Sequence, residues 1–215
     1  MFMTILRIIL DLLFIFYLAM WIIFPAYLSN AVVVPISNKY KQKFHRIDAG
    51  RKLGEYRILG DGKTIEGFLI GSIIGIIGGI IQFLLSPIFY QVSVAWYDFY
   101  IPILIPRSDV VFYLSFNLVV LTRTLFFPVG ALLGDIIGSF IKRRLGKPRG
   151  EPLIIIDQLD LLLGVLLISL PLAPIHASFF QIDLPYLLTI VILTHFIHRI
   201  VNKLAFKLNV KNVAH

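Results

Sequence analysis

Long runs of apolar residues alternate with short polar segments along this chain, which indicates several helices that cross a membrane. About 20 consecutive apolar residues are enough to span the hydrocarbon core of a bilayer as a helix. By that measure the sequence predicts five spans, at residues 8–29, 67–89, 110–137, 158–174 and 184–202. We therefore expect an all-α integral membrane protein with about five transmembrane helices, in which residues 1–215 form a single transmembrane domain.

Two of these spans need comment. The first could be mistaken for a secretory signal peptide, but it contains Asp11 and lacks a small-residue cleavage site before Asn30, so we expect it to be retained. The third segment, about 110–141, is too long for one straight crossing. We expect Pro128 and the glycines after it to kink this helix and its last turns to project toward the cytoplasm.

Composition supports the membrane assignment and narrows the chemistry. Hydrophobic residues make up 58% of the chain and the mean hydropathy is +0.88, which is far too apolar for a soluble domain of this size. The chain has no cysteine. Disulfides, thiolate metal sites and cysteine nucleophiles are therefore excluded, and a metal ion would be held by oxygen or histidine ligands.

The net charge of +8 is informative because of where the basic residues lie. They gather in residues 39–63, in residues 142–149 and in the C-terminal tail, whereas the connections at 90–109 and 175–183 hold only Arg107. The positive-inside rule then places the N-terminus outside, and the C-terminus and the loops of about 36–66 and 142–156 in the cytoplasm. Much of this charge could serve only to set topology or to attract anionic lipid. No aromatic residues interleave with it in a nucleic-acid-binding module, so no nucleic-acid partner is expected.

Glycines recur at every fourth position in two of the spans and predict close helix packing. They are Gly67, Gly71, Gly75 and Gly79 in the second span, and Gly130, Gly134 and Gly138 in the third. Small residues at this spacing form a flat stripe that lets helix backbones approach one another in lipid. We expect the second and third spans to pack together. Gly134 and Gly138, on either side of Asp135, would also leave room for a ligand.

Three carboxylates are the leading candidates for chemistry. Asp135 lies within a span, where a charge is costly and needs a partner. Asp157 and Asp160 are three residues apart and therefore share one helix face. Together the three make a plausible oxygen cage for Mg²⁺. The alternative is that Asp157 or Asp160 only caps its helix or complements the helix dipole.

Further polar residues lie near the expected membrane edge. Residues 57–67 look at first like a phosphate-binding loop, but a Walker A motif would need glycine where this chain has Arg57, so we reject that interpretation. Lys63 remains a candidate at the mouth of the second span, in what could also be a simple turn and helix start. Asn30, His198 and Asn202 could belong to a site or could be interfacial packing residues.

Taken together, the polar motifs resemble those of the archaeal CDP-archaeol synthase family, distant relatives of the CDP-diacylglycerol synthases. The motifs in order are PAYLSNA at 25–31, LGDGKT at 59–64, SFIKRRL at 139–145, RGEP at 149–152, DQLD at 157–160 and HxxxN at 198–202. The wider synthase pattern has Lys-Asp where this chain has Pro148-Arg149, and its His-Gly-Gly is missing here. These departures are typical of the archaeal branch, and they make Asp135 our candidate for the first metal ligand.

The resemblance implies transfer of a cytidylyl group from CTP to a phosphorylated prenyl-ether glycerolipid, unsaturated archaetidic acid, in membrane phospholipid biosynthesis. Metal ions stabilise the attacking and leaving oxygens in such a transfer, so we expect Mg²⁺ as cofactor and assign Asp135, Asp157 and Asp160 as its catalytic ligands. The partners would be CTP, the phosphorylated diether lipid and the bilayer. The residues expected to bind the nucleotide are Lys142, Arg143, Arg144, Arg149 and Lys63, with Ser139, Asn30, Asn202 and His198 as neutral partners.

Two other classes of protein compete with this one. A small transporter could use an intramembrane path lined by Asp135 and Arg123. It would spread polar residues across the membrane depth, whereas here they gather at one face. Another membrane lipid phosphotransferase, a CDP-alcohol phosphotransferase, would need DGxxAR followed by GxxxDxxxD, and the sequence contains neither motif.

Overall fold

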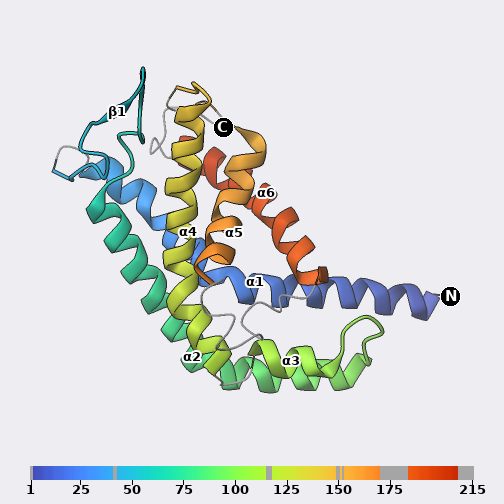
Figure 1. Cartoon of the computed structure of the whole chain (residues 1–215). Coiled ribbons are helices and arrows are strands. Elements are labelled where there is room, and N and C mark those ends of the chain that lie inside the picture. The colour runs from blue at the N-terminus through green and yellow to red at the C-terminus, as the bar shows by residue number, and fades with distance from the viewer. Residues whose placement is uncertain are drawn as a thin grey trace.

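The structure is a computed structural model that describes residues 2–40, 43–114, 118–148, 151, 153–169 and 184–207. Within these ranges the chain forms six helices and one small hairpin (Figure 1). The elements are α1 (Phe2–Lys39), β1 (Lys52–Leu53), β2 (Tyr56–Arg57), α2 (Ile65–Tyr100), α3 (Arg107–Leu114), α4 (Leu118–Arg144), α5 (Ile154–Ser169) and α6 (Leu184–Lys207).

Three helices are long and apolar enough to cross a membrane, over the stretches Phe2–Val33, Ile65–Tyr100 and Val120–Arg144. α5 and α6 carry shorter apolar stretches, Leu159–Ile168 and Leu184–Ile197. The chain is thus a mostly helical, multi-pass membrane protein. The number of crossings and their orientation stay predictions, and residues 170–174 of the expected fourth span lie outside the described residues.

The expected third span, 110–137, is wrong as one continuous helix. α3 ends at Leu114 and α4 begins at Leu118, and the two helices run in different directions in Figure 1. The reason is that α3 begins with polar residues and packs sideways beneath the bundle. Val110 and Tyr113 are buried there, and Asp109 accepts a hydrogen bond of 2.8 Å from the Tyr186 hydroxyl of α6.

The all-α prediction also missed the hairpin. β1 and β2 are antiparallel, with Lys52 opposite Arg57 and Leu53 opposite Tyr56. The two-residue turn between the strands starts at Gly54, whose φ of 68° is a left-handed conformation that suits glycine. This hairpin stands at one end of the bundle, next to the end of α4 and the start of α2 (Figure 1).

The core lies where the middle of α1 meets α4, α5 and α6. Leu18, Ile23, Leu161, Val165 and Ile190 are buried there in one apolar cluster. The first turns of α1 project away from the bundle in Figure 1 and expose apolar side chains, as expected for a helix surrounded by lipid.

The glycine stripes pack closely, but not against each other. A Cβ built on Gly75 of α2 would lie 2.6 Å from Pro128 Cβ of α4, so the expected packing of the second and third spans is confirmed. The stripe on α4 faces α5 instead. A Cβ on Gly134 would lie 1.8 Å from the carbonyl oxygen of Asp160, and one on Gly164 of α5 would lie 2.1 Å from that of Gly130. The α4 glycines therefore bring α5 and its aspartates close to Asp135.

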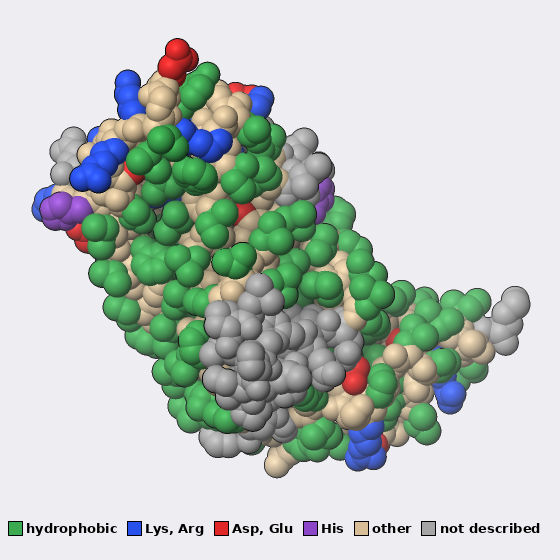
Figure 2. Space-filling model, viewed as in Figure 1, with side chains coloured by type: hydrophobic (Ala, Val, Ile, Leu, Met, Phe, Trp, Pro, Cys, Tyr) green, Lys and Arg blue, Asp and Glu red, His purple; other side chains and the backbone are tan. Residues whose placement is uncertain are grey.

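Charged side chains are distributed unevenly over the surface. On the face shown in Figure 2, most gather at the hairpin end and a smaller group lies at the opposite side, and the described residues visible between them are mainly apolar. Glu55 in the hairpin turn before α2 and Asp98 near the end of α2 are both exposed. This distribution fits a bundle embedded in a bilayer with two polar ends.

Candidate active site

The polar end of the bundle brings together residues that are far apart in the sequence. The loop after the hairpin delivers Lys63 to α4, where its ammonium group forms an ion pair with the Asp135 carboxylate. Thr64 caps the start of α2, because its hydroxyl accepts a hydrogen bond of 3.2 Å from the backbone N–H of Gly67. Lys63 therefore stands directly before a fixed helix start.

A second lysine and aspartate pair lies about two turns further along α4. Lys142, near the end of α4, forms an ion pair with Asp157 in the first turn of α5. Asp157 Oδ2 also accepts a hydrogen bond of 3.1 Å from the backbone N–H of Leu153, just before the helix. Asp157 thus has the helix-start role that we considered and an ion pair in addition.

Asp160 lies between the two pairs. It is buried, and the charges of Asp135, Asp157 and Lys63 all act on its carboxylate. Gly138 of α4 makes room for it, because a Cβ there would lie 2.9 Å from Asp160 Oδ2. The three predicted aspartates are therefore brought together by the close contact of α4 and α5.

The donor chemistry of this cluster fits Mg²⁺, since three carboxylates converge beside glycines that leave space. Among the described side chains, however, no group of three or more acidic or histidine residues is arranged to hold a metal ion. Two of the three carboxylates, those of Asp135 and Asp157, form ion pairs with lysines. The magnesium site therefore stays a prediction.

The three consecutive basic residues at the end of α4 go to three different places. Lys142 pairs with Asp157, and Arg143 donates to the carbonyl oxygen of Lys147 in the following turn. Arg144 donates to the carbonyl oxygens of Leu53 and Arg57, at 2.7 and 2.6 Å. Successive helical residues point about 100° apart, so they cannot all face one ligand.

The remaining predicted residues divide into two groups. Ser139 is buried next to the loop that carries Lys63, since a Cβ on Gly60 would lie 3.8 Å from its hydroxyl oxygen. Asn30 is half-buried on α1, one turn before Val33, which lies beside Lys63. Arg149 and the side chains of His198 and Asn202 lie outside the described residues.

A charge network around the buried Asp48 in the loop was not predicted from the sequence. Arg57 donates to both oxygens of Asp48, at 2.7 and 2.9 Å, and to Asp61 Oδ1 at 2.7 Å. Burial opposes ionisation of Asp48, but hydrogen bonds from Arg57 and from the N–H groups of Gly50 and Leu59, together with the Arg57 charge, lower the pKa of Asp48 below its ordinary value. The four-residue spacing of Arg57 and Asp61 was the available signal.

A small cavity beside Lys63 joins polar and apolar surfaces. Its polar wall includes Lys63 and Asp135, and its apolar wall includes Val33 of α1, Phe68 of α2 and Leu132 of α4. A charged headgroup and the start of an apolar chain could therefore lie next to each other here.

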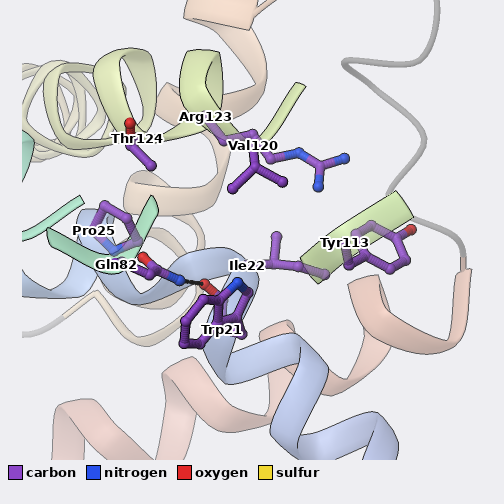
Figure 3. Close-up of a pocket in the computed structure, with 8 residues that line it drawn as sticks. All are labelled: Trp21, Ile22, Pro25, Gln82, Tyr113, Val120, Arg123 and Thr124. Atoms are coloured by element: carbon purple, nitrogen blue, oxygen red, sulfur yellow. Dashed lines mark hydrogen bonds between the residues drawn. The ribbon is translucent and has the colours of Figure 1, made fainter. Parts of the chain in front are cut away.

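A second cavity lies deeper, between α1, α2, α3 and α4 (Figure 3). It is lined by Trp21, Gln82, Thr124 and the buried Arg123, whose guanidinium lies 4.9 and 5.0 Å from the ring centres of Phe112 and Tyr113. Twelve residues of α4 separate Arg123 from Asp135, about 18 Å along a helix. The two residues line different cavities, which gives no support to a transport path between them.

A helical membrane bundle with carboxylates and lysines at one polar end is the arrangement expected of an enzyme that acts on a phosphorylated lipid. Comparison with known proteins identifies the family of enzymes to which the chain belongs. Residues 9–215 match the family model described as CarS-like, CDP-archaeol synthase. The chain belongs to the CDP-archaeol synthase family, which confirms the resemblance noted in its motifs. It is accordingly a CTP-dependent cytidylyltransferase that acts on a lipid phosphate.

Individual relatives agree. The chain is 37% identical to the CDP-archaeol synthase of Pyrobaculum islandicum over 202 residues, covering 94% of this chain and 97% of the relative. It is 36% identical to that of Thermococcus gammatolerans over 196 residues, covering 91% and 94%. A solved structure described as "Structural insight into an intramembrane enzyme for archaeal membrane lipids biosynthesis" is similar with a TM-score of 0.56, 28% identity and 85% of this chain covered, against 92% of that one.

Proposed function

We propose that this enzyme transfers the cytidylyl group of CTP to the phosphate of unsaturated archaetidic acid at the cytoplasmic edge of the membrane. A lipid phosphate oxygen would attack the α-phosphorus of CTP, forming the new P–O bond while the bond to pyrophosphate breaks. The observation that supports this most is the group of three aspartates and two lysines at the polar end of α4 and α5. No covalent enzyme intermediate is needed, because the lipid phosphate is already an ionised nucleophile.

The two ion pairs suggest how the site receives its substrates. Lys63 and Lys142 are held on carboxylates and are only partly exposed, so each keeps a cation at the position where phosphate charge would arrive. When the nucleotide and the lipid phosphate bind, each lysine would turn from its carboxylate to phosphate oxygens. Asp135, Asp157 and Asp160 would then be available to hold Mg²⁺, which when bound would neutralise charge on the attacking and leaving oxygens.

The cavity beside Lys63 supports placing the lipid phosphate near this lysine. Its apolar wall of Val33, Phe68 and Leu132 comes from three helices of the bundle and lies beside the ion pair of Lys63 and Asp135. Ser139 and Asn30 would supply neutral hydrogen bonds. Prenyl chains could lie between the helices and open to the bilayer.

The test is a direct assay. Purified protein in detergent is incubated with labelled CTP, Mg²⁺ and the phosphorylated unsaturated diether lipid, and CDP-lipid and pyrophosphate are measured together. Equal amounts of both products are expected, with none when the lipid lacks its phosphate. A diacyl phosphatidic acid and a saturated diether phosphate, each supplied at the same concentration, test the lipid preference. Faster turnover of the diacyl lipid would contradict the proposed substrate.

Chelation tests the cofactor. Excess chelator should stop product formation, and added Mg²⁺ should restore it, because charge neutralisation by the ion is the proposed contribution. Full activity in chelator would contradict the magnesium proposal while leaving the lipid assignment intact.

The proposed orientation can be tested in the same protein, because it has no cysteine. Single cysteines replacing exposed Glu55 and exposed Asp98 should label from opposite sides of the membrane. The Glu55 position should react only with a reagent that reaches the cytoplasm. Labelling of the Glu55 position from outside would place the candidate site on the wrong face.

A further inference from the structure

The proposed mechanism gives no role to Arg144, the last residue of α4. The sequence placed it among the phosphate-binding residues, but its guanidinium is directed at the hairpin. Nη1 donates to the Leu53 carbonyl at 2.7 Å, and Nη2 donates to the carbonyls of Arg57 at 2.6 Å and Tyr56 at 3.4 Å. These acceptors belong to both strands, so a single side chain on α4 spans the hairpin.

Two neighbours of Arg144 fix this contact. The ring of Phe140, one turn earlier on α4, has its centre 5.4 Å from the guanidinium carbon and holds the group by a cation–π contact. Gly146, two residues later, has a φ of 70°, and a Cβ there would lie 3.2 Å from the Tyr56 hydroxyl oxygen. The end of α4 is therefore shaped to receive the hairpin.

The hairpin in turn determines where Lys63 stands. Arg57, whose carbonyl binds Arg144, binds Asp48 and Asp61 with its side chain. The backbone N–H of Ile47 donates to the Lys63 carbonyl at 3.0 Å, next to Asp48. The loop is thus attached to α4 at two points: the hairpin is held by Arg144, and Lys63 is held by Asp135.

From these contacts we propose that Arg144 is a positioning residue, which fixes the hairpin on α4 so that Lys63 reaches the carboxylate cluster, and that it is not a phosphate ligand. Arginine suits this role because its planar fork can bind several carbonyls at once, which a lysine ammonium does less well. Its catalytic consequence rests on the proposed role of Lys63. Its structural consequence does not.

The first experiment measures the structural consequence without substrates. Hydrogen exchange is followed in the full-length protein for peptides that cover residues 46–63. Arg144→Ala should speed exchange there, including the amides of Ile47 and Ile58, which are bonded to Lys63 and Arg51 carbonyls. Exchange in α5 should not change. Arg51→Ala removes an exposed arginine from the same loop and is the matched control, with exchange as in wild type.

The second experiment separates positioning from direct phosphate contact. Arg144→Ala is combined with Lys63→Ala and, separately, with Lys142→Ala, and kcat and KM are measured for each substrate. If Arg144 acts through Lys63, Arg144→Ala should change the same kinetic constants as Lys63→Ala. It should have little further effect in a protein that already carries Lys63→Ala. In the Lys142→Ala background, the fold-loss caused by Arg144→Ala should instead multiply with the fold-loss caused by Lys142→Ala.

Arg144→Lys keeps the charge and provides a variant more certain to fold. It should not restore slow exchange in residues 46–63, and its kinetics should resemble those of Arg144→Ala. The proposal is overturned if exchange in the hairpin is unchanged in Arg144→Ala. It is equally overturned if Arg144→Lys retains full activity, or if the Arg144 effect is undiminished when Lys63 is absent. Should no variant of Lys63 alter activity while Arg144→Ala still loosens the hairpin, the proposed role of Lys63 fails and the attachment of the hairpin stands.

Discussion

The two lysine and aspartate pairs of the site look alike but are built in different ways. Lys142 and Asp157 lie 15 residues apart, at the facing ends of consecutive helices that pack through glycines. Lys63 and Asp135 are separated by 72 residues, and Lys63 is carried by a loop that a hairpin and a buried charge network hold in place. One side of the site therefore depends on helix packing, and the other depends on a polar scaffold outside the helices.

The largest effects are expected where the two sides meet. Asp160→Asn should nearly abolish cytidylyl transfer, because Asp160 is the buried carboxylate between the pairs. Asp157→Asn should do the same, and Asp135→Asn should at least cripple the enzyme. Product formation is measured alongside size-exclusion elution, which checks that each variant remains folded. Full activity of Asp160→Asn would remove it from the catalytic group.

Loss of either lysine should have a smaller effect. A charge-assisted hydrogen bond contributes roughly 1.5–3 kcal/mol, so Lys63→Ala and Lys142→Ala should each lower kcat/KM by about 10- to 160-fold. If the pairs serve different substrates, Lys63→Ala should act mainly on the lipid and Lys142→Ala mainly on CTP. Steady-state kinetics with each substrate varied in turn distinguishes them. Identical effects of both variants on both substrates would contradict this division of the site.

Glycine substitutions test the side of the site that depends on helix packing. A Cβ on Gly134 would meet the Asp160 carbonyl at 1.8 Å, a backbone atom that cannot easily move, so Gly134→Ala should reduce activity and destabilise by about 1–3 kcal/mol. Gly60→Ala is the control on the scaffold side. Its Cβ would lie 3.8 Å from the Ser139 hydroxyl oxygen, an ordinary contact, and its φ lies outside the left-handed region. Thermal unfolding in detergent measures both, and equal melting temperatures would contradict the packing argument.

The smallest expected effect is a pH dependence confined to the hairpin side. The pKa of Asp48 is lowered in the folded protein by Arg57, which also binds Asp61, so the carboxylate stabilises the loop above the unfolded pKa of about 3.9. That stabilisation is lost as the pH falls through the folded pKa. Hydrogen-exchange protection of residues 46–63 should therefore hold from pH 7 to 5 and decline below about 4. Asp48→Asn should show low protection throughout this range.

Much of this molecule could be predicted from its sequence for simple physical reasons. Apolar runs long enough to cross a bilayer require helices, and the positions of α1, α2 and α6 follow from them. Motifs that need only the order of residues, such as DQLD at 157–160, were enough to name the family. Lys142 and Asp157 were both predicted as site residues, although the ion pair between them was not.

What the sequence could not show depends on contacts between distant segments. The break between α3 and α4 follows from sideways packing of α3, which the apolar run at 110–137 conceals. The orientation of the α4 glycines toward α5 is a choice between two partners that each accept close packing. Arg144 shows the same limit. Its neighbours in sequence are basic, but the direction of its side chain on α4 decides that it meets the hairpin carbonyls. Residue types and spacing determine which groups are available, and only the packing of helices and loop decides which of them meet.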